Sequence, residues 1–450
     1  MPYTGVQFAA ARQQVSLRLA DPGQVFWSDA EIGTYVVEAL QAFSALTGYW
    51  NDTGLVNVSA NEVWVPLINL VNGAGVNPIT WFVDTLPMLT MMEYHLLEPP
   101  LSVRPWAGTE MFSYAQITAA LQRRADQFVV DTGVPVAELI INVPSPAISR
   151  IPLTALSGLV DIRRMAWIDA TTGYISVMVP GDEFEFNAYN PGWQQEPGTP
   201  LEYSVLDSPP LTAQVVPPPI ASGLIDALYT NTRQLSTFPT DDEIFMPGDY
   251  AWALKYGAMA DLLNMESEAK DAERAAYCEQ RYQMGVEVCR AASSVKQAYY
   301  LGAQIPLSTV TAWDTWSPTW QNLPEGPPQS VASAGLNLLA VNPTPDQPYQ
   351  IGVDVTASAP VPVNDTDYIQ LGPEALEAIY GYAQHVAAFK QGGEEFQASM
   401  PLFQNFIRVA GLYNARLANF SSFATFLADR QTRVEAMRPR IEGAEVEAKQ

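Results

Sequence analysis

Two helical regions in the second half of the chain resemble each other and are expected to fold as the same supersecondary unit. Residues 250–297 and 373–438 are rich in helix-forming residues, and Gly257 and Gly381, each preceded by a tyrosine, lie about 124 residues apart. A charged break divides each region, which predicts two helical hairpins closed by polar turns; either a duplication or a chance likeness explains the match. Because a mid-helix glycine costs about 1 kcal/mol relative to alanine, both glycines predict a close helix approach.

The N-terminal part also begins with helices. Ser28 and Glu31 have the spacing of a capping box, and apolar residues then follow one helical face until Gly48. The amphipathic stretch 6–19 precedes an Asp-Pro-Gly turn. We therefore expect an antiparallel helix pair, followed by short strands within 61–83 and by a third helix near residues 109–131.

A β pattern fills residues 144–219. Residues 159–169 and 174–179 are separated by a Thr-Thr-Gly turn, and residues 183–189 alternate strictly between polar and mostly apolar side chains. The stretch 211–216 has prolines on both sides, which predicts an edge strand. These segments predict a small antiparallel sheet or sandwich.

The chain of 450 residues is long enough for more than one hydrophobic core. We predict an α+β fold in which helical hairpins carry an inserted antiparallel β-sheet or sandwich. Residues 305–364 contain Trp313, Trp316 and Trp320 among prolines, and we expect an ordered arm or loop docked on a neighbour. The expected units are an N-terminal helical unit with short strands (1–140), an antiparallel β unit (141–235), a helical hairpin (236–304), the Pro/Trp-rich arm or loop (305–364), and a second helical hairpin with a C-terminal tail (365–450).

The net charge is strongly negative. Forty-eight acidic residues against 23 basic ones give a formal charge of −25, which argues against binding nucleic acid by neutralising its phosphates. The acidic residues either serve ordinary solubility or line a passage along which DNA does not stick. The sequence contains no run of eighteen apolar residues and no secretory signal pattern, so we expect no membrane contact.

Few residues have the chemistry of a catalytic or metal site. The only two histidines, His95 and His385, lack a second ligand at metal-binding spacing; we interpret His385 as a core helix residue and His95 as a strand or turn residue. Cys278 and Cys289 are eleven residues apart in one expected helix, too far apart to bridge, and are expected to be free core thiols. We predict no catalytic, cofactor-binding or metal residues, and no cofactor.

Clusters of acidic residues leave an enzymatic alternative open. Asp182, Glu183 and Glu185, or residues 241–243, could supply the paired carboxylates of a glycosidase. The same residues, together with Asp249, are also typical of turns and helix starts, where an acid near the helix N-terminus contributes about 0.3–1 kcal/mol. We favour the turn and capping interpretation.

Two stretches resemble the head-to-tail adaptor and related neck, or connector, proteins of tailed bacteriophages. They are FWSDAEIGTYVVEAL (26–40) and FPTDDEIFMPGDYAWALKYGAMADLLNMESEAKDAERAAYCEQRY (238–282). In that family a tryptophan and an acidic cap open one helix, and a proline-led helix, a charged turn and a long helix form the core. The corresponding residues here are Trp27, Pro247, Gly257, Ala260, Asp271, Ala275 and Tyr282. The chain is longer than the usual small adaptor, since it adds the β unit and the second hairpin.

The resemblance implies a non-enzymatic structural protein of the virion, assembled in the host cytoplasm. Its expected partners are further copies of itself in a ring, twelve by the resemblance, together with the portal protein and tail or neck proteins. DNA would pass through the ring without specific binding. Two alternatives are a virion-associated enzyme that degrades glycan or peptidoglycan, and a tail-fibre or receptor-binding module whose aromatic segment 313–320 contacts sugar.

Overall fold

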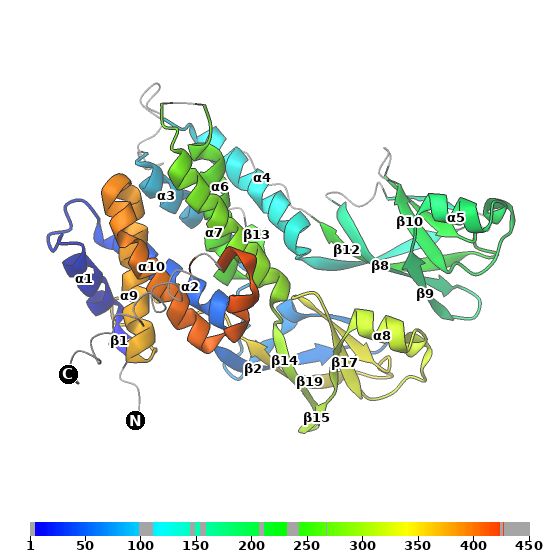
Figure 1. Cartoon of the computed structure of the whole chain (residues 1–450). Helices are drawn as coiled ribbons and strands as arrows, with labels where there is room; N and C mark the ends of the chain where they lie inside the picture. Colours follow the sequence, from blue (N-terminus) through cyan, green and yellow to red (C-terminus); the bar gives the residue numbers. More distant parts are fainter. Residues whose placement is uncertain are drawn as a thin grey trace, which may run out of the picture.

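The computed structural model describes residues 5–98, 111–144, 149–153, 159–206, 211–231, 243–266, 268–423 and 426. These residues form three parts, which Figure 1 shows together: a group of long helices, two sheets beside them, and a β unit that extends away from the helices. We call these parts the helical body, the β platform and the β extension. The α+β fold class expected from the sequence is confirmed, and most strand pairs are antiparallel.

One hydrophobic core joins the helical body to much of the platform. It contains residues from four of the five expected units, and residues 141–235 contribute nothing to it. The helical units therefore do not have separate cores. The long helices of the body are α1 (Phe8–Arg18), α2 (Asp29–Thr47), α3 (Thr85–Leu96), α4 (Tyr114–Thr132), α6 (Ala251–Leu263), α7 (Ala272–Ala291), α9 (Pro373–Gln391) and α10 (Gly393–Tyr413).

The predicted N-terminal helix pair is confirmed. The Ser28 hydroxyl accepts a hydrogen bond from the Glu31 amide (3.2 Å), and Gly48 ends α2 in the left-handed conformation (φ 57°). The Glu31 carboxylate does not complete the capping box, because it bonds Tyr35 and Lys390 instead. α1 contacts both α2 and α9.

The two predicted helical hairpins are also confirmed, as the pairs α6–α7 and α9–α10. Their glycines differ. A Cβ added at Gly257 would lie 2.7 Å from Cδ2 of Tyr282, so the close approach expected there exists. A Cβ added at Gly381 would lie 3.7 Å from Cβ of Leu402, an ordinary contact, so the close approach predicted there is wrong.

The β platform consists of two sheets with strand orders β15-β14-β19-β2-β4 and β16-β17-β18-β3. Strands from the N-terminal part pair with strands more than 200 residues later: Trp64 pairs with Ala340, and Asn51 with Thr356. The platform strands are β2 (Asn51–Val58), β3 (Trp64–Pro66), β4 (Val71–Asn72), β14 (Val295–Tyr300), β15 (Ala303–Ile305), β16 (Leu307–Thr309), β17 (Ser330–Ala334), β18 (Leu338–Asn342) and β19 (Tyr349–Thr356).

Residues 305–364 are therefore not the arm or loop that we expected. Apolar residues of β17, β18 and β19 are buried in the platform, continuously in β18 and in alternation in β19, and α8 (Val310–Trp316) and η5 (Trp320–Asn322) lie between the strands. The prolines and tryptophans occupy the connections. Two small strand pairs complete this part of the fold: β1 (Val6–Gln7) with β20 (Tyr368–Ile369), and β5 (Phe82–Asp84) with β13 (Glu243–Phe245); the short helices η1 (Leu67–Asn69), η4 (Gly248–Tyr250) and η6 (Ala415–Asn419) lie in connections.

The β extension is a seven-stranded sheet with the order β6-β12-β8-β9-β10-β11-β7, and it has its own core. β6 and β7 lie at opposite ends of this order, yet both contribute to that core and only a few residues separate them in sequence, so the sheet curls into an open barrel. Its strands are β6 (Val136–Val143), β7 (Arg150–Pro152), β8 (Leu159–Asp169), β9 (Ile175–Pro180), β10 (Glu202–Leu206), β11 (Thr212–Val216) and β12 (Gly223–Asn231).

Three local expectations in and around these parts are wrong. Residues 183–189 form the helix α5 (Glu183–Tyr189), which is followed by η3 (Trp193–Gln195). The Asp182 side chain caps the start of α5, and Phe186 is the residue of this helix that is buried against the barrel. β11 is not an edge strand, since it lies between β10 and β7. His95 belongs to α3, a helix that the sequence did not predict.

Candidate functional site

The two histidines are completely buried in the helical body and lie at the ends of one chain of hydrogen bonds. At one end, Nδ1 of His385 is 2.7 Å from Oγ of Ser399, and Nε2 is 2.7 Å from the hydroxyl of Tyr277. Arg281 donates to the Tyr277 hydroxyl (3.0 Å), which leaves the phenol proton for His385. His385 is therefore neutral and carries its proton on Nδ1, and its interpretation as a core histidine is confirmed.

The chain continues from Arg281 to His95. Arg281 donates to the hydroxyl of Tyr382, which donates to Oε1 of Glu38 (3.0 Å). Oε2 of Glu38 pairs with Nζ of Lys255, and Nζ lies 3.1 Å from Nε2 of His95. Five helices, α2, α3, α6, α7 and α9, contribute these residues, so the chain forms only when the body is assembled.

The charges in this hydrogen-bonded series of side chains do not balance when its two basic groups and its one carboxylate are all charged. Lys255 (1% exposed) and Arg281 (2% exposed) are cations, and Glu38 (1% exposed) is the only anion bonded to them among the described residues. Aromatic rings surround the Arg281 guanidinium and supply part of its stabilisation. These rings belong to Trp252, Tyr256, Tyr277, Tyr382 and Phe403.

Burial determines the protonation of these groups. It lowers the pKa of Lys255, although Glu38 opposes this shift, and it lowers the pKa of His95 well below its usual value, with a further contribution from Lys255. Burial also lowers the pKa of His385 to about 3. Both imidazoles are thus neutral at neutral pH, and the amine of Lys255 loses its proton more easily than a surface lysine does.

The sequence did not lead us to Glu38, Lys255 or Arg281. A signal existed for one of them, because Lys255 is the only charged residue in the otherwise apolar stretch 251–260. A helix that is apolar on all sides is buried, so a charged residue inside it must find a partner.

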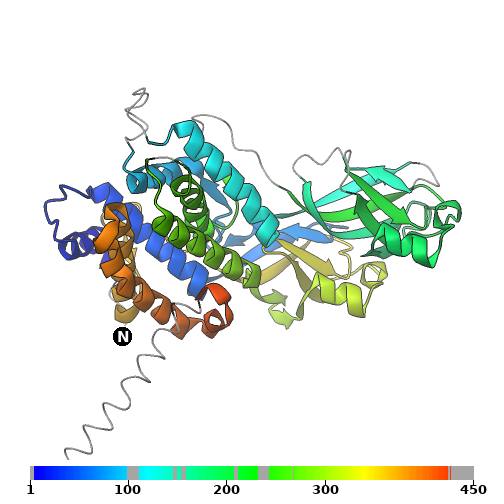
Figure 2. The same cartoon turned by 45° about the horizontal axis from the view of Figure 1, so that its top comes forward.

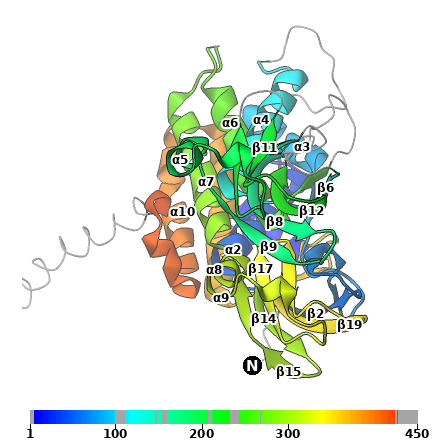
Figure 3. The same cartoon turned by 90° about the vertical axis from the view of Figure 1, so that its right-hand side faces the viewer.

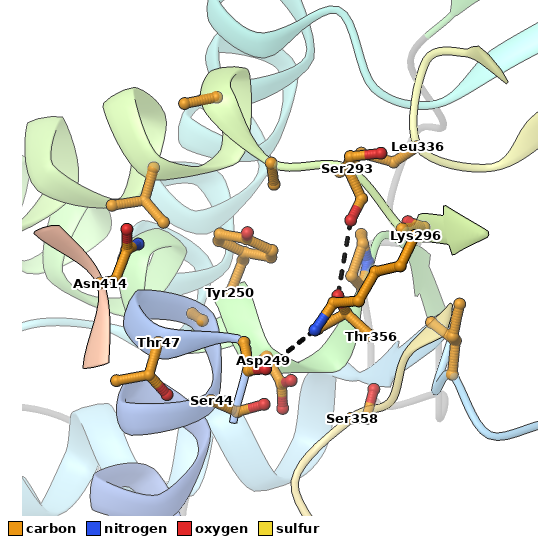
Figure 4. A pocket seen from close by; sticks show the side chains of 18 of the residues that line it. Ser44, Thr47, Asp249, Tyr250, Ser293, Lys296, Leu336, Thr356, Ser358 and Asn414 are labelled. Atoms are coloured by element: carbon orange, nitrogen blue, oxygen red, sulfur yellow. Dashed lines mark hydrogen bonds between the residues drawn. The ribbon is translucent and has the colours of Figure 1, made fainter. Parts of the chain in front are cut away.

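A second group of polar residues surrounds a pocket of about 420 Å³ where the helical body meets the platform (Figure 4). Within it, Ala359 N–H donates to Asp249 Oδ1 (3.1 Å), and Lys296 Nζ donates to the carbonyl oxygen of Gly48 (3.2 Å) at the end of α2. Further polar side chains around this pocket belong to Ser44, Thr47, Ser293, Thr356, Ser358 and Asn414.

Asp249 is the acidic residue that lines this pocket among the described residues. Burial raises its pKa to about 7, and hydrogen bonds from Ser44 and Ala359 only partly oppose the shift. The carboxyl group therefore exchanges a proton near neutral pH. Asp249 lies in η4, just before α6. Its carboxyl group accepts from the backbone amide of Ala359 after β19, and no side chain caps α6. The interpretation of Asp249 as a helix-capping acid is therefore wrong.

The other acidic candidates do not form a paired site. Asp182 caps α5 by accepting from the Phe184 amide (2.7 Å), and Glu183 and Glu185 lie in the first turn of that helix, which confirms the capping interpretation. Glu243 lies in β13, while residues 241 and 242 fall outside the described residues. In the part of the chain that the structure describes, no three His, Cys, Asp or Glu side chains are placed to hold a metal ion.

The two cysteines match their expectation. Cys278 and Cys289 are free, buried and on the same helix, α7. Burial raises the pKa of the Cys289 thiol to about 12, so it is not a reactive thiolate at neutral pH.

The end of the β extension exposes several large apolar side chains. Phe184 and Tyr189 on α5 are 79% and 89% exposed. Val179 and Leu201 are neighbours, because the amide of Val179 donates to the carbonyl oxygen of Leu201 (2.8 Å). Val179 lies in β9 shortly before α5, and α5 lies at the far end of the extension (Figure 2). Together with Ile220, these four residues form what we call the extension tip. Figure 3 looks onto this end, with α5 in front of the helical body.

Buried polar contacts hold the base of the extension against the platform. Arg164 pairs with Asp226 (3.3 Å) on the neighbouring strand and with Asp314 (2.8 Å) on α8 of the platform, and its guanidinium lies over the rings of Trp64 and Trp320. This places Trp320 in a buried junction, away from the open position that a sugar-binding loop would need.

Two asparagines strengthen the same junction. The Asn337 side chain bonds both the amide (2.9 Å) and the carbonyl oxygen (2.7 Å) of Val136 in β6. The Asn322 side chain bonds both the amide (2.7 Å) and the carbonyl oxygen (2.6 Å) of Ile175 in β9. Each asparagine side chain thus forms the pair of backbone hydrogen bonds that a neighbouring strand would form. These contacts hold the extension in one orientation against the platform.

The sequence matches no protein-family model, and no curated protein is similar to it.

Proposed function

We propose that the protein is a structural subunit of a tailed-phage virion that assembles with copies of itself into a ring in the neck. The ring would join the portal protein to the tail or neck proteins and let DNA pass without specific binding. The proposal takes its phage identity and its twelve copies from the sequence resemblance. The observation that carries the assembly step is the extension tip.

A solvent-exposed group of aromatic and aliphatic side chains at the end of a fixed projection favours contact with another protein. When such a patch meets a different surface on the next copy, the contact repeats head to tail, and a suitable rotation closes it into a ring. The rigid junction at Arg164 supports this proposal, because a ring of defined size requires a constant angle between the two contact surfaces.

The charge of the chain supports the proposed passage of DNA. With a formal charge of −25, the surface repels phosphates, so DNA would move past the ring without being retained. No described helix has the length and apolar character needed to cross a bilayer. The portal protein, the neck location and assembly in the host cytoplasm are parts of the same proposal.

The test compares the full chain with a tip variant. We expect native mass spectrometry and electron microscopy of the wild-type protein to show an annular oligomer. Replacing Phe184 and Tyr189 together by serine removes the two aromatic side chains of the extension tip, and we expect a monomer whose circular dichroism is unchanged. The matched control is Leu301→Ser, which changes another apolar residue (87% exposed) at the β14–β15 hairpin and should leave the ring intact.

Two outcomes would contradict the proposal. If the wild-type protein remains monomeric at tens of micromolar, the proposed ring is contradicted. If the tip variant still forms the annulus, the extension tip is not the contact that builds it. Hydrolysis of peptidoglycan or capsular glycan that disappears in Glu183→Gln or Glu185→Gln would instead favour the enzymatic alternative.

A further inference from the structure

A second cavity, of about 450 Å³, opens beside the charged chain of the helical body. Elements that meet there come from distant parts of the sequence: α1, α2, β5, α3 and the start of α6. Its walls are largely apolar and include Phe8, Val37, Phe82, Met88 and Met91. A cavity of this size and character is typical of a site for a small amphipathic molecule.

The most buried residues that line this cavity are polar. Glu38 and Lys255, the fully buried ion pair, are among them, and so is Trp252, whose indole Nε1–H has no acceptor among the described residues. An ammonium group has three donors, and Lys255 uses one on Glu38 and one toward His95. One N–H of Lys255 and the N–H of Trp252 therefore have no hydrogen-bond acceptor among the described residues, and Nζ of Lys255 also lies 4.5 Å from the centroid of the Tyr256 ring.

The charge count indicates what these donors would bind. The hydrogen-bonded series of buried side chains contains two cations, Lys255 and Arg281, and one anion, Glu38. One further negative charge would therefore make this series electrically neutral. Arg12 at the cavity wall adds no positive charge, because two carboxylates, Asp29 and Asp365, pair with it; Asp84 at the rim is exposed to solvent. Two donors match the two oxygens of a carboxylate, whereas a phosphate would leave an oxygen and a second charge without partners.

We propose that this cavity binds a small carboxylic acid with an apolar body, whose carboxylate bonds Lys255 and the Trp252 indole while its apolar part lies between α1, α2 and α3. In the empty protein, loss of a proton from Lys255 relieves the excess positive charge. Binding of the anion favours the protonated amine, so ligand binding is coupled to proton uptake. The groups that face Lys255 are Glu38 on α2, His95 on α3 and Cys278 and Arg281 on α7, with Tyr382 on α9 reached through Glu38.

The test uses octanoate as the probe and 1-octanol as its uncharged match, with calorimetry on the full chain. We expect octanoate to bind at least about tenfold more tightly than octanol, as a charge-assisted hydrogen bond requires. Lys255→Met should weaken octanoate about tenfold or more and leave octanol within about twofold. This variant should fold, because Arg281 and Glu38 remain as one cation and one anion.

A second variant tests the cavity itself without touching the charged chain. Val37 lines the cavity from α2 and is only partly buried, so Val37→Trp should fill the space and weaken both probes. The affinity for octanoate should also fall as pH rises through the lowered pKa of Lys255, since the protonated amine binds the anion. Equal binding of the two probes, octanoate binding that survives both substitutions, or no binding of octanoate would each overturn the proposal.

Discussion

Single residues in the helical body show how a buried charge depends on partners that are distant in sequence. Glu38, Lys255 and Arg281 come from three helices, and the two buried cations depend on Glu38 as their anion. Glu38 has the central place, because it bonds Lys255 directly and Arg281 through Tyr382.

Replacing Glu38 by glutamine should therefore destabilise the protein strongly. The substitution leaves two buried cations without an anion, and we expect the free energy of unfolding to fall by about 3–5 kcal/mol in denaturant titrations. The control is Glu266→Gln, which removes an exposed partner of Lys270 and should change the stability by less than about 0.5 kcal/mol. Equal losses in the two variants would contradict the importance of the buried chain.

Asp249 should make stability depend on pH in a defined direction. Its pKa in the folded protein is about 7, against about 3.9 in an unfolded chain, so the folded state holds a proton that the unfolded state releases. This contribution to stability is complete below about pH 4 and is lost as pH rises through 7.

Asparagine at position 249 mimics the protonated carboxyl and can still accept from Ala359. The Asp249→Asn variant should thus match the wild type near pH 4 and exceed it by a few kcal/mol near pH 8, at about 1.4 kcal/mol per pKa unit. Thermal or urea unfolding across this range measures the difference. A constant difference at all pH values would show that Asp249 does not titrate as argued.

At the scale of elements, the two helical hairpins share a pattern and differ in packing. Gly257 and Gly381 occupy corresponding positions, but only Gly257 faces a ring, that of Tyr282, at close range. The two hairpins share a sequence pattern, and the side chains packed against the two glycines differ.

The pair of glycines permits a matched test. Gly257→Ala should lower the free energy of unfolding by about 1–3 kcal/mol, because the new Cβ would overlap the Tyr282 ring. Gly381→Ala finds an ordinary contact at 3.7 Å and should raise stability by up to about 1 kcal/mol through helix propensity. Denaturant unfolding of both variants provides the measurement, and effects of the same sign would show that their environments do not differ as described.

At the scale of the whole molecule, the orientation of the β extension depends on a small buried junction. Arg164 bonds two carboxylates, one on each side of that junction. The neighbouring Arg163 has a half-exposed side chain, and among the described residues its ion pair is with Asp161 in its own strand. The two arginines are adjacent in sequence, and only one of them connects the two parts.

Arg164→Met should loosen the extension without unfolding the helical body. It leaves Asp226 and Asp314 without their cation, so we expect faster amide exchange in β8 and β12 and unchanged exchange in α6 and α7. Arg163→Met is the control and should preserve the wild-type exchange pattern. If exchange in β8 stays slow in Arg164→Met, the asparagine contacts alone are sufficient to fix the extension.

The sequence by itself determined those features that local interactions control. The Ser28 cap, the Gly48 end of α2, the two hairpins and three of the seven strands of the extension (β8, β9 and β11) follow from propensity, capping and periodicity, and the structure confirms them. A local pattern predicts the wrong structure where it is compatible with both a strand and a helix. Residues 183–189 alternate between polar and apolar side chains as a strand does, but the Asp182 cap and the packing of Phe186 produce a helix.

Tertiary structure alone decided which distant residues meet. The pairing of β2 with β19, the burial of His95, the ion pair of Glu38 with Lys255 and the pocket around Asp249 join segments that are about 50 to 300 residues apart. No local pattern encodes such contacts, because their free energy comes from burying surfaces that become neighbours only after the chain has folded.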